Sequence, residues 1–262
     1  MRAAMRSTLI LVILAAAESA SGQRLEYRPL SDEALSAGPR LDYRTMQGDS
    51  EPAGFKLQWA LLDRFEYAAQ RGRDGYAWDF SALLGGDRHR LWLGTNGEGE
   101  AWASPHYVEL NALYSLALGG DWDANAGLRY DAQSGEDRAY AALGAQYDDG
   151  KAWLGGWAYL SHKGDLSARL AGYYNQKLAG PLIVQPSAEL DYYGEDMPEL
   201  GLGRGFGYAE AGLRLRYEIK EAFAPYVGLS WSRDLGRTAR MTRADGEDPE
   251  TKSLVMGLRS SF

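Results

Sequence analysis

The sequence predicts an all-β protein, an antiparallel transmembrane β-barrel of about twelve strands. Three observations support this prediction. Apolar and polar residues alternate in segments of about ten residues, the length that a tilted strand needs to cross a bilayer. Turn residues such as Gly119-Gly120-Asp121 separate these segments. The chain also ends on Phe262, an aromatic end typical of outer-membrane barrels and expected to be the signal read by the barrel assembly machinery.

Residues 1–22 are predicted to be a secretory signal peptide. Arg2 and Arg6 precede an apolar core from Leu9 to Ala17, which small residues follow. That core is too short for a membrane anchor, because a spanning helix needs about 20 apolar residues. Residues 23–54 contain scattered Pro and Gly without a sustained period, which indicates a flexible periplasmic leader. The barrel itself is expected over residues 55–262.

The barrel region divides into segments of strand length separated by turns. These segments are Phe55–Tyr67, Tyr76–Gly85, Arg90–Glu98, Tyr107–Leu116, Trp122–Tyr130, Arg138–Tyr147, Lys151–Leu160, Leu166–Asn175, Leu182–Tyr193, Gly205–Ile219, Ala224–Trp231 and Thr251–Phe262. The longest connection, Leu235–Glu250, is polar and is predicted to be an extracellular loop.

The alternation assigns two faces to the strands. In Gly205–Ile219, Leu213 and Leu215 fall on one face, and Arg214 and Arg216 fall on the other. In a barrel the apolar face meets lipid and the ionic face lines the lumen. The inward charged residues are predicted to be Asp79, Glu109, Asp123, Arg129, Arg169, Glu189, Glu210, Arg214 and Arg216. They would form either a structural network or a polar path for ions, and the structural network is favoured because nearby opposite charges compensate one another.

Composition excludes several other classes of protein. A mean hydropathy of −0.41 and the absence of a long apolar run argue against a bundle of membrane helices. The absence of Cys excludes disulfides and thiolate metal sites. A net charge of −8 argues against a nucleic-acid partner. Three scattered His and no Gly-x-Ser-x-Gly segment argue against an enzyme.

Several sequence blocks resemble the copper resistance protein B family. They follow one another through the barrel region and include Leu62–Tyr67, Gly85–Leu93, Ala126–Asp131, Ser161–Arg169, Met197–Gly203, Arg214–Ile219 and Phe223–Gly228. The resemblance implies a barrel in the outer membrane of a Gram-negative bacterium, linked to copper resistance, copper homeostasis and copper ion binding. Copper is therefore the expected cofactor.

The residues that remain as candidate copper ligands are His89, His106, His162 and Met46, because copper accepts imidazole and thioether ligands. None of the His forms a close pair in the sequence, and a lone His in a turn is more often simply solvated. Family members often carry a leader rich in Met and His. Here the leader has Met46 and no His.

Two functions stay open at this point. The first is a copper-handling outer-membrane barrel, and the second is a structural or general diffusion barrel without a metal role. The expected partners are outer-membrane lipid, the barrel assembly machinery, a periplasmic multicopper oxidase and lipopolysaccharide. Arg237, Arg240 and Arg243 in the longest loop are the residues that would meet lipopolysaccharide, although a solvated loop is the simpler interpretation.

Overall fold

The computed structural model describes residues 56–133, 136–220 and 222–262. The predicted signal peptide and leader, and the candidate ligand Met46, lie outside these residues. Within the described part of the chain, no helix is long and apolar enough to span a membrane.

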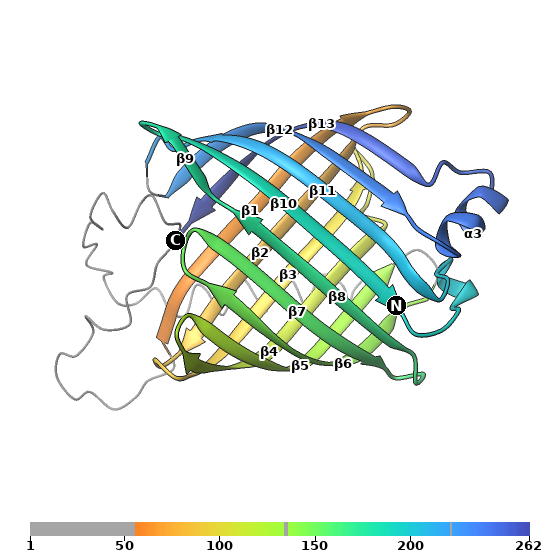
Figure 1. The fold of residues 1–262 in the computed structure, drawn as a ribbon, viewed down its shortest axis with the longest axis horizontal. Coiled ribbons are helices and arrows are strands. Elements are labelled where there is room, and N and C mark those ends of the chain that lie inside the picture. Colours follow the sequence, from red (N-terminus) through yellow and green to blue (C-terminus); the bar gives the residue numbers. More distant parts are fainter. Residues whose placement is uncertain (1–55, 134–135, 221) are drawn as a thin grey trace. The chain divides into compact units, whose positions relative to one another are not determined.

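The described residues form a closed antiparallel β-barrel (Figure 1). Its strands are β1 (Lys56–Gln70), β2 (Gly75–Gly85), β3 (His89–Glu100), β4 (Tyr107–Gly119), β5 (Trp122–Gln133), β6 (Arg138–Asp148), β7 (Ala152–Ser161), β8 (Leu166–Tyr174), β9 (Gln176–Ala179), β10 (Leu182–Tyr193), β11 (Gly205–Tyr217), β12 (Phe223–Asp234) and β13 (Glu250–Ser261). Consecutive strands pair, except that β8 and β9 both pair with β10, and the β1–β13 pairing closes the sheet. The predicted fold is confirmed.

The barrel has twelve strands because β8 and β9 are two parts of one strand. Both pair with β10, and only Asn175 lies between them. The Asn175 side chain is buried, and its Oδ1 accepts hydrogen bonds from Gln185 Nε2 at 3.0 Å and Arg216 Nη2 at 2.8 Å. The predicted segment Leu166–Asn175 therefore ended too early, since the strand resumes after this interruption.

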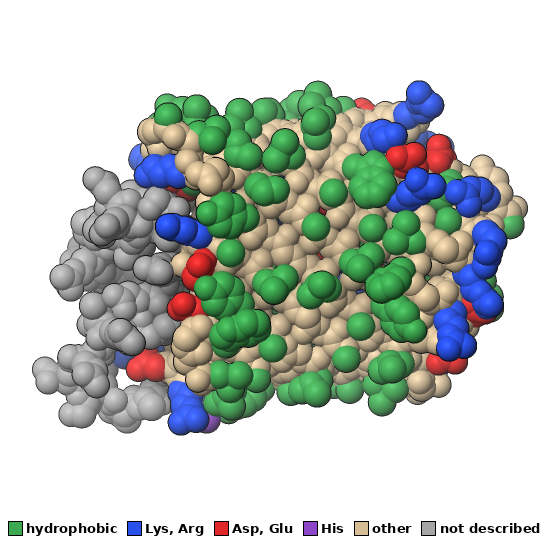
Figure 2. All heavy atoms as spheres, viewed as in Figure 1, with side chains coloured by type: hydrophobic (Ala, Val, Ile, Leu, Met, Phe, Trp, Pro, Cys, Tyr) green, Lys and Arg blue, Asp and Glu red, His purple; other side chains and the backbone are tan. Residues whose placement is uncertain are grey.

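The outer surface of the barrel is apolar across its middle. Exposed residues include Leu128 and Leu143, each 66% accessible, and Leu229 at 60%. Inward-facing neighbours such as Val255 and Ile183 are 1% accessible. Figure 2 shows hydrophobic side chains spread over the middle of the viewed face and charged side chains towards its two ends. This distribution is what a barrel in a hydrocarbon layer requires.

The two ends of the barrel differ. One end, here called the short-turn end, carries the brief connections such as β2–β3 and β4–β5 together with the C-terminus. The other end, here called the loop end, carries the long connections 194–204 and 235–249. The second of these was predicted to be a loop, but part of it is helix α3 (Thr238–Ala244), with Thr238 and Ala239 buried. The helix was not expected, because its buried face is only two residues wide and leaves little periodic signal in a polar segment.

Aromatic side chains lie directly over glycines on the inner wall. Trp157 and Trp92 pack against a small cluster formed by Leu113, Tyr140, Ala142 and Tyr159. A Cβ added to Gly144 would lie 2.2 Å from Trp157 Cδ1 and 2.5 Å from the carbonyl oxygen of Gly156. The indole can therefore lie flat on the strand only because residue 144 has no side chain.

We expect Gly144→Ala to destabilise the barrel by about 1–3 kcal/mol, the usual cost of overpacking. Urea unfolding in lipid vesicles, followed by Trp fluorescence, measures the effect. Gly156→Ala is the matched control, because an added Cβ there meets its nearest atom, Leu170 Cδ1, at 3.6 Å. Equal stability of the two variants would contradict the packing argument.

Candidate functional site

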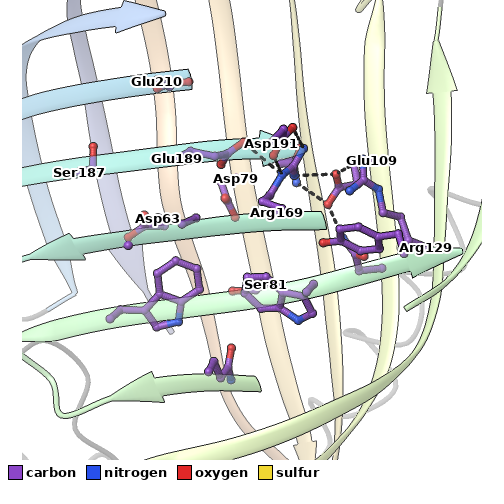
Figure 3. Close-up of a pocket in the computed structure, with 18 of the residues that line it drawn as sticks. Asp63, Asp79, Ser81, Glu109, Arg129, Arg169, Ser187, Glu189, Asp191 and Glu210 are labelled. Atoms are coloured by element: carbon purple, nitrogen blue, oxygen red, sulfur yellow. Dashed lines mark hydrogen bonds and ion pairs between the residues drawn. The ribbon is translucent and has the colours of Figure 1, made fainter. Parts of the chain in front are cut away.

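The lumen contains a cavity of about 1170 Å³. Residues from strands all around the barrel line it, and Figure 3 shows charged side chains from several strands meeting in it. Met197, Leu200, Leu202 and Thr238 from the long connections line it at the loop end. The cavity is therefore a shared space on the barrel axis rather than a pocket of one strand pair.

The charges around this cavity are unequal. Its carboxylates are those of Asp63, Asp79, Glu98, Glu109, Asp121, Asp123, Asp131, Asp148, Glu189, Asp191, Glu210 and Asp234. Its cationic side chains are those of Arg64, Arg129, Arg169 and Arg214, and no Lys or His of the described chain lines it. Twelve carboxylates thus line the cavity with four guanidiniums, and Arg90 and Arg259 pair from outside the lining with Asp123 and Asp63. The carboxylates remain in excess, and such an excess favours cations.

Arg129 is the centre of the most buried ion-pair network. Its Nε and Nη2 donate to both oxygens of Asp131, at 2.7 and 2.8 Å, and Nη2 also lies 2.9 Å from Glu109 Oε2. The guanidinium stacks on the Tyr159 ring at 4.5 Å. All three charged side chains are nearly inaccessible to solvent, so each depends on its partners for compensation.

Arg169 extends this network across the lumen. Its Nη1 donates to Glu109 Oε2 at 3.1 Å, and its Nε lies 3.2 Å from Glu189 and 3.0 Å from Asp191 (Figure 3). These contacts join β4, β8 and β10, which are not all neighbours in the sheet. The network therefore connects separate parts of the wall through the bore.

The other predicted lumen residues fall into separate groups. Arg214 pairs with Glu66 at 2.9 Å, and Arg64 lies 3.6 Å from Glu210. Asp79 faces the cavity without a hydrogen bond or ion pair to any residue that the structure describes. Near the short-turn end, Asp123 pairs with Arg90, and Arg216 lies outside the cavity lining on Asn175.

Several charged lumen residues were not among the predicted lumen charges. Asp131 and Asp191 lie two positions after Arg129 and Glu189, and the alternation places them on the same polar face. For Glu66 and Asp63, the alternation of the sequence does not give the correct face. The register of β1 shifts between Leu62 and Phe65, and this bulge breaks the alternation on which the prediction relied.

The connection 194–204 folds over the loop end of the cavity. It contains a short 3₁₀ helix, η1 (Pro198–Leu200), and Met197, which is 3% accessible. The fully buried Arg138 of β6 donates to Glu199 Oε1 at 2.6 Å and also contacts Asp165 and Met197 Sδ. A backbone hydrogen bond within its own residue and the Arg138 contact lower the pKa of Glu199 below its usual range.

Helix α3 holds this connection from the other side. Arg237 Nη1 lies 2.5 Å from Asp196 Oδ2, and the Gly203 amide donates to Thr238 Oγ1 at 3.0 Å. The amide of Arg204 donates to Asp196 and, together with Arg237, lowers the pKa of that carboxyl. The two long connections therefore form one cap over part of the lumen, which we call the loop cap (residues 194–204 and 235–249).

The three candidate His ligands are not brought together. His89 lies at the short-turn end beside the Tyr114 hydroxyl, whereas His106 and His162 lie at the loop end. His106 Nε2 is 3.3 Å from Glu98 Oε1, and His162 Nδ1 is 3.3 Å from the backbone of Ala139. Within residues 56–133, 136–220 and 222–262, no group of three or more His, Asp or Glu side chains is placed to hold a metal ion.

Comparison with known proteins decides the family. The profile of the copper resistance protein B precursor (CopB) family matches residues 56–262, the whole barrel. This chain belongs to the copper resistance protein B family. The resemblance seen in the sequence blocks is thereby confirmed.

Two curated CopB-family relatives match most of this barrel. It is 39% identical over 204 residues to the copper resistance protein B homolog of Pseudomonas syringae pv. tomato, covering 76% of this chain and 68% of that one. It is 36% identical over 209 residues to copper resistance protein B of Escherichia coli, covering 77% and 68%.

Solved structures with a similar fold are outer-membrane porins. The NanC porin matches with a TM-score of 0.53 and 14% identity, over 75% of this chain and 98% of the porin. The KdgM porin matches with a TM-score of 0.50 and 12% identity, over 78% and 99%. At such low identity the CopB-family barrel shares their architecture, and the likeness carries no information about cargo.

We expect Arg129→Met to destabilise the barrel by about 3–5 kcal/mol, because it leaves Glu109 and Asp131 buried with less positive compensation. Arg240→Met is the matched control, since Arg240 is exposed on α3. Urea unfolding in vesicles measures both variants. A change in Arg129→Met no larger than in the control would show that the network contributes little.

The hydrogen bond to Glu98 raises the pKa of His106 above its ordinary value. The stabilisation from this pair is therefore full below about pH 6.5 and is lost as the pH rises through the raised pKa. We expect Glu98→Gln to lower the pKa of His106, as measured by NMR titration of the imidazole in detergent. Glu136→Gln, in another loop, should leave it unchanged, and an equal pKa in all three proteins would refute the assignment.

Proposed function

We propose that this barrel handles copper ions in the outer membrane as part of copper resistance, by binding them in its acidic lumen or controlling their passage through it. The observation that carries the proposal is the excess of carboxylates over guanidiniums around the cavity. Membership of the copper resistance protein B family identifies copper as the cation to test.

The surroundings of the lumen strengthen the electric field of its charges. The wall around the lumen is protein and lipid of low dielectric, so a surplus of one charge sign inside it concentrates counter-ions strongly. The guanidiniums compensate the carboxylates that they touch, such as Glu109 with Arg129 and Arg169. Asp79 faces the cavity and makes no hydrogen bond or ion pair with another described residue, although the Arg64 charge acts on it.

The side chains that line the cavity favour weak, reversible binding of copper over tight storage. Carboxylate oxygens are weaker copper ligands than imidazole or thioether groups. The described His side chains lie outside the cavity lining, and Met197 is the thioether within it. A lumen built in this way attracts copper without holding it tightly, which suits passage or transient binding.

The proposed location is the outer membrane of a Gram-negative bacterium, with the loop end outside and the short-turn end towards the periplasm. In this orientation Phe262, 75% accessible, is available to the assembly machinery. Arg240 and Arg243 on α3 face the lipopolysaccharide layer, and a periplasmic multicopper oxidase would meet the short-turn end. We propose no catalytic role for the barrel.

The alternative is a structural or general diffusion barrel without a metal role. The loop cap and the ion-pair network favour it, because both stabilise the barrel and narrow the bore whatever the cargo. The experiment must therefore separate a lumen that selects copper from one that only holds the wall together.

The test compares two triple variants in a strain that lacks the chromosomal gene. Asp79→Asn/Glu189→Gln/Glu210→Gln removes three lumen charges, and Asp245→Asn/Glu247→Gln/Asp248→Asn removes the same charge from the exposed loop. We expect the control triple, but not the lumen triple, to restore copper tolerance, with zinc tolerance unaffected. In planar bilayers the lumen triple should lower the cation-over-anion permeability ratio about tenfold.

Heat-dependent gel mobility confirms that both variants fold. Unchanged copper tolerance in the deletion strain, together with altered detergent sensitivity, would refute the copper role and support the envelope-barrel alternative.

A further inference from the structure

Two buried arginines form a layer near the short-turn end, apart from the cavity lining. Arg216 of β11 is 1% accessible and Arg259 of β13 is 8% accessible. Both point inward from strands that flank β12, where Tyr226 and Ala224 are their register partners. The position is separate from the Arg129–Arg169 network, which lies towards the loop end.

The hydrogen bonds of this pair are incomplete. Arg259 Nε donates to Asp63 Oδ1 at 2.6 Å, and Arg216 Nη2 donates to Asn175 Oδ1, a neutral amide oxygen, at 2.8 Å. Arg216 Nε and Nη1 and Arg259 Nη2 are buried without a partner in the described part of the chain. Three strong donors of two charged side chains are thus unsatisfied.

The local charge is unbalanced as well. The Arg259 charge repels the Arg216 guanidinium, and Asp63 is the nearest strong attraction for both. Asp63 is thus the main counter-charge for two buried guanidiniums, and the half-buried Glu218 acts on both more weakly. A buried charge without compensation is strongly destabilising, whereas a nearby anion would satisfy both the charge and the donors.

The Arg216 side chain is also held in place. Gln185 Nε2 donates to Asn175 Oδ1 at 3.0 Å, so the same amide oxygen is fixed by a second strand while it accepts from Arg216. The interruption between β8 and β9 puts this amide in the lumen. A preorganised donor of this kind loses little freedom when it binds a ligand.

We infer that Arg216 and Arg259 bind a small monovalent anion of the chloride class between their free N–H groups. The anion neutralises the layer. Without it, three buried guanidinium donors have no partner among the described residues. The inference stands on the arginine geometry and holds whether or not the lumen handles copper.

The direct test replaces chloride by bromide in crystals and locates the bromide by its anomalous X-ray scattering. In crystals of the full chain soaked in sodium bromide, we expect an anomalous peak within hydrogen-bonding distance of Arg216 Nη1 and Arg259 Nη2. The peak should be lost in Arg216→Gln. Water alone at this position in bromide-soaked wild-type crystals would overturn the proposal.

Thermal unfolding in solution gives an independent test, in which one variant should lose chloride binding and another should bind chloride more tightly. At constant ionic strength in detergent, replacing gluconate by chloride should raise the thermal midpoint of the wild type. Arg216→Gln should abolish this shift, and Arg240→Gln on exposed α3 should retain it. Asp63→Asn should bind chloride more tightly, because it removes the carboxylate that competes for Arg259. A chloride shift that is absent in the wild type, or weaker in Asp63→Asn, would refute the site.

Discussion

The ladder between β1 and β13 is the constraint on which the rest of this structure depends. Residues at the two ends of the barrel sequence pair from Leu61 with Ser261 to Gln70 with Ser253, so the sheet closes on itself. Backbone groups in hydrocarbon have no water to bond, and closure satisfies all of them within the sheet. Closure also gives every strand one lipid face and one lumen face. The alternation of the sequence and the ionic interior both follow from it.

The charged side chains of the lumen have two effects: they connect strands across the bore, and they give the cavity an excess of carboxylates. Glu109, held by Arg129 and Arg169, joins strands through the bore and makes the wall rigid. The remaining carboxylates exceed the guanidiniums and give the cavity its negative field. Near the short-turn end the buried Arg216 and Arg259 add positive charge beside Asp63. The balance of charge in the barrel interior therefore differs along its axis.

Strand positions were largely predictable. The segment Gly205–Ile219 differs from β11, Gly205–Tyr217, by two residues at one end, because period-two alternation continues as long as one face meets lipid. Prediction failed where the alternation was interrupted. The bulge in β1 turned Glu66 inward unexpectedly, and Asn175 divided one strand into β8 and β9. Helix α3 packs on a loop distant in the sequence, so its own residues carried little signal.

By itself, the sequence determined the barrel, the approximate strand limits and the face of most charged residues, because each follows from contacts with lipid and turns that are local in the chain. Only the tertiary structure decided which charges meet. Arg169 reaches Glu109 across a separation of 60 residues, and Arg138 reaches Glu199 across 61. Such pairs depend on the closed register and the width of the bore, which bring distant strands within hydrogen-bonding distance. The closed register also holds His89 at the end of the barrel opposite to His106 and His162, which lie at the loop end in connections between different strands.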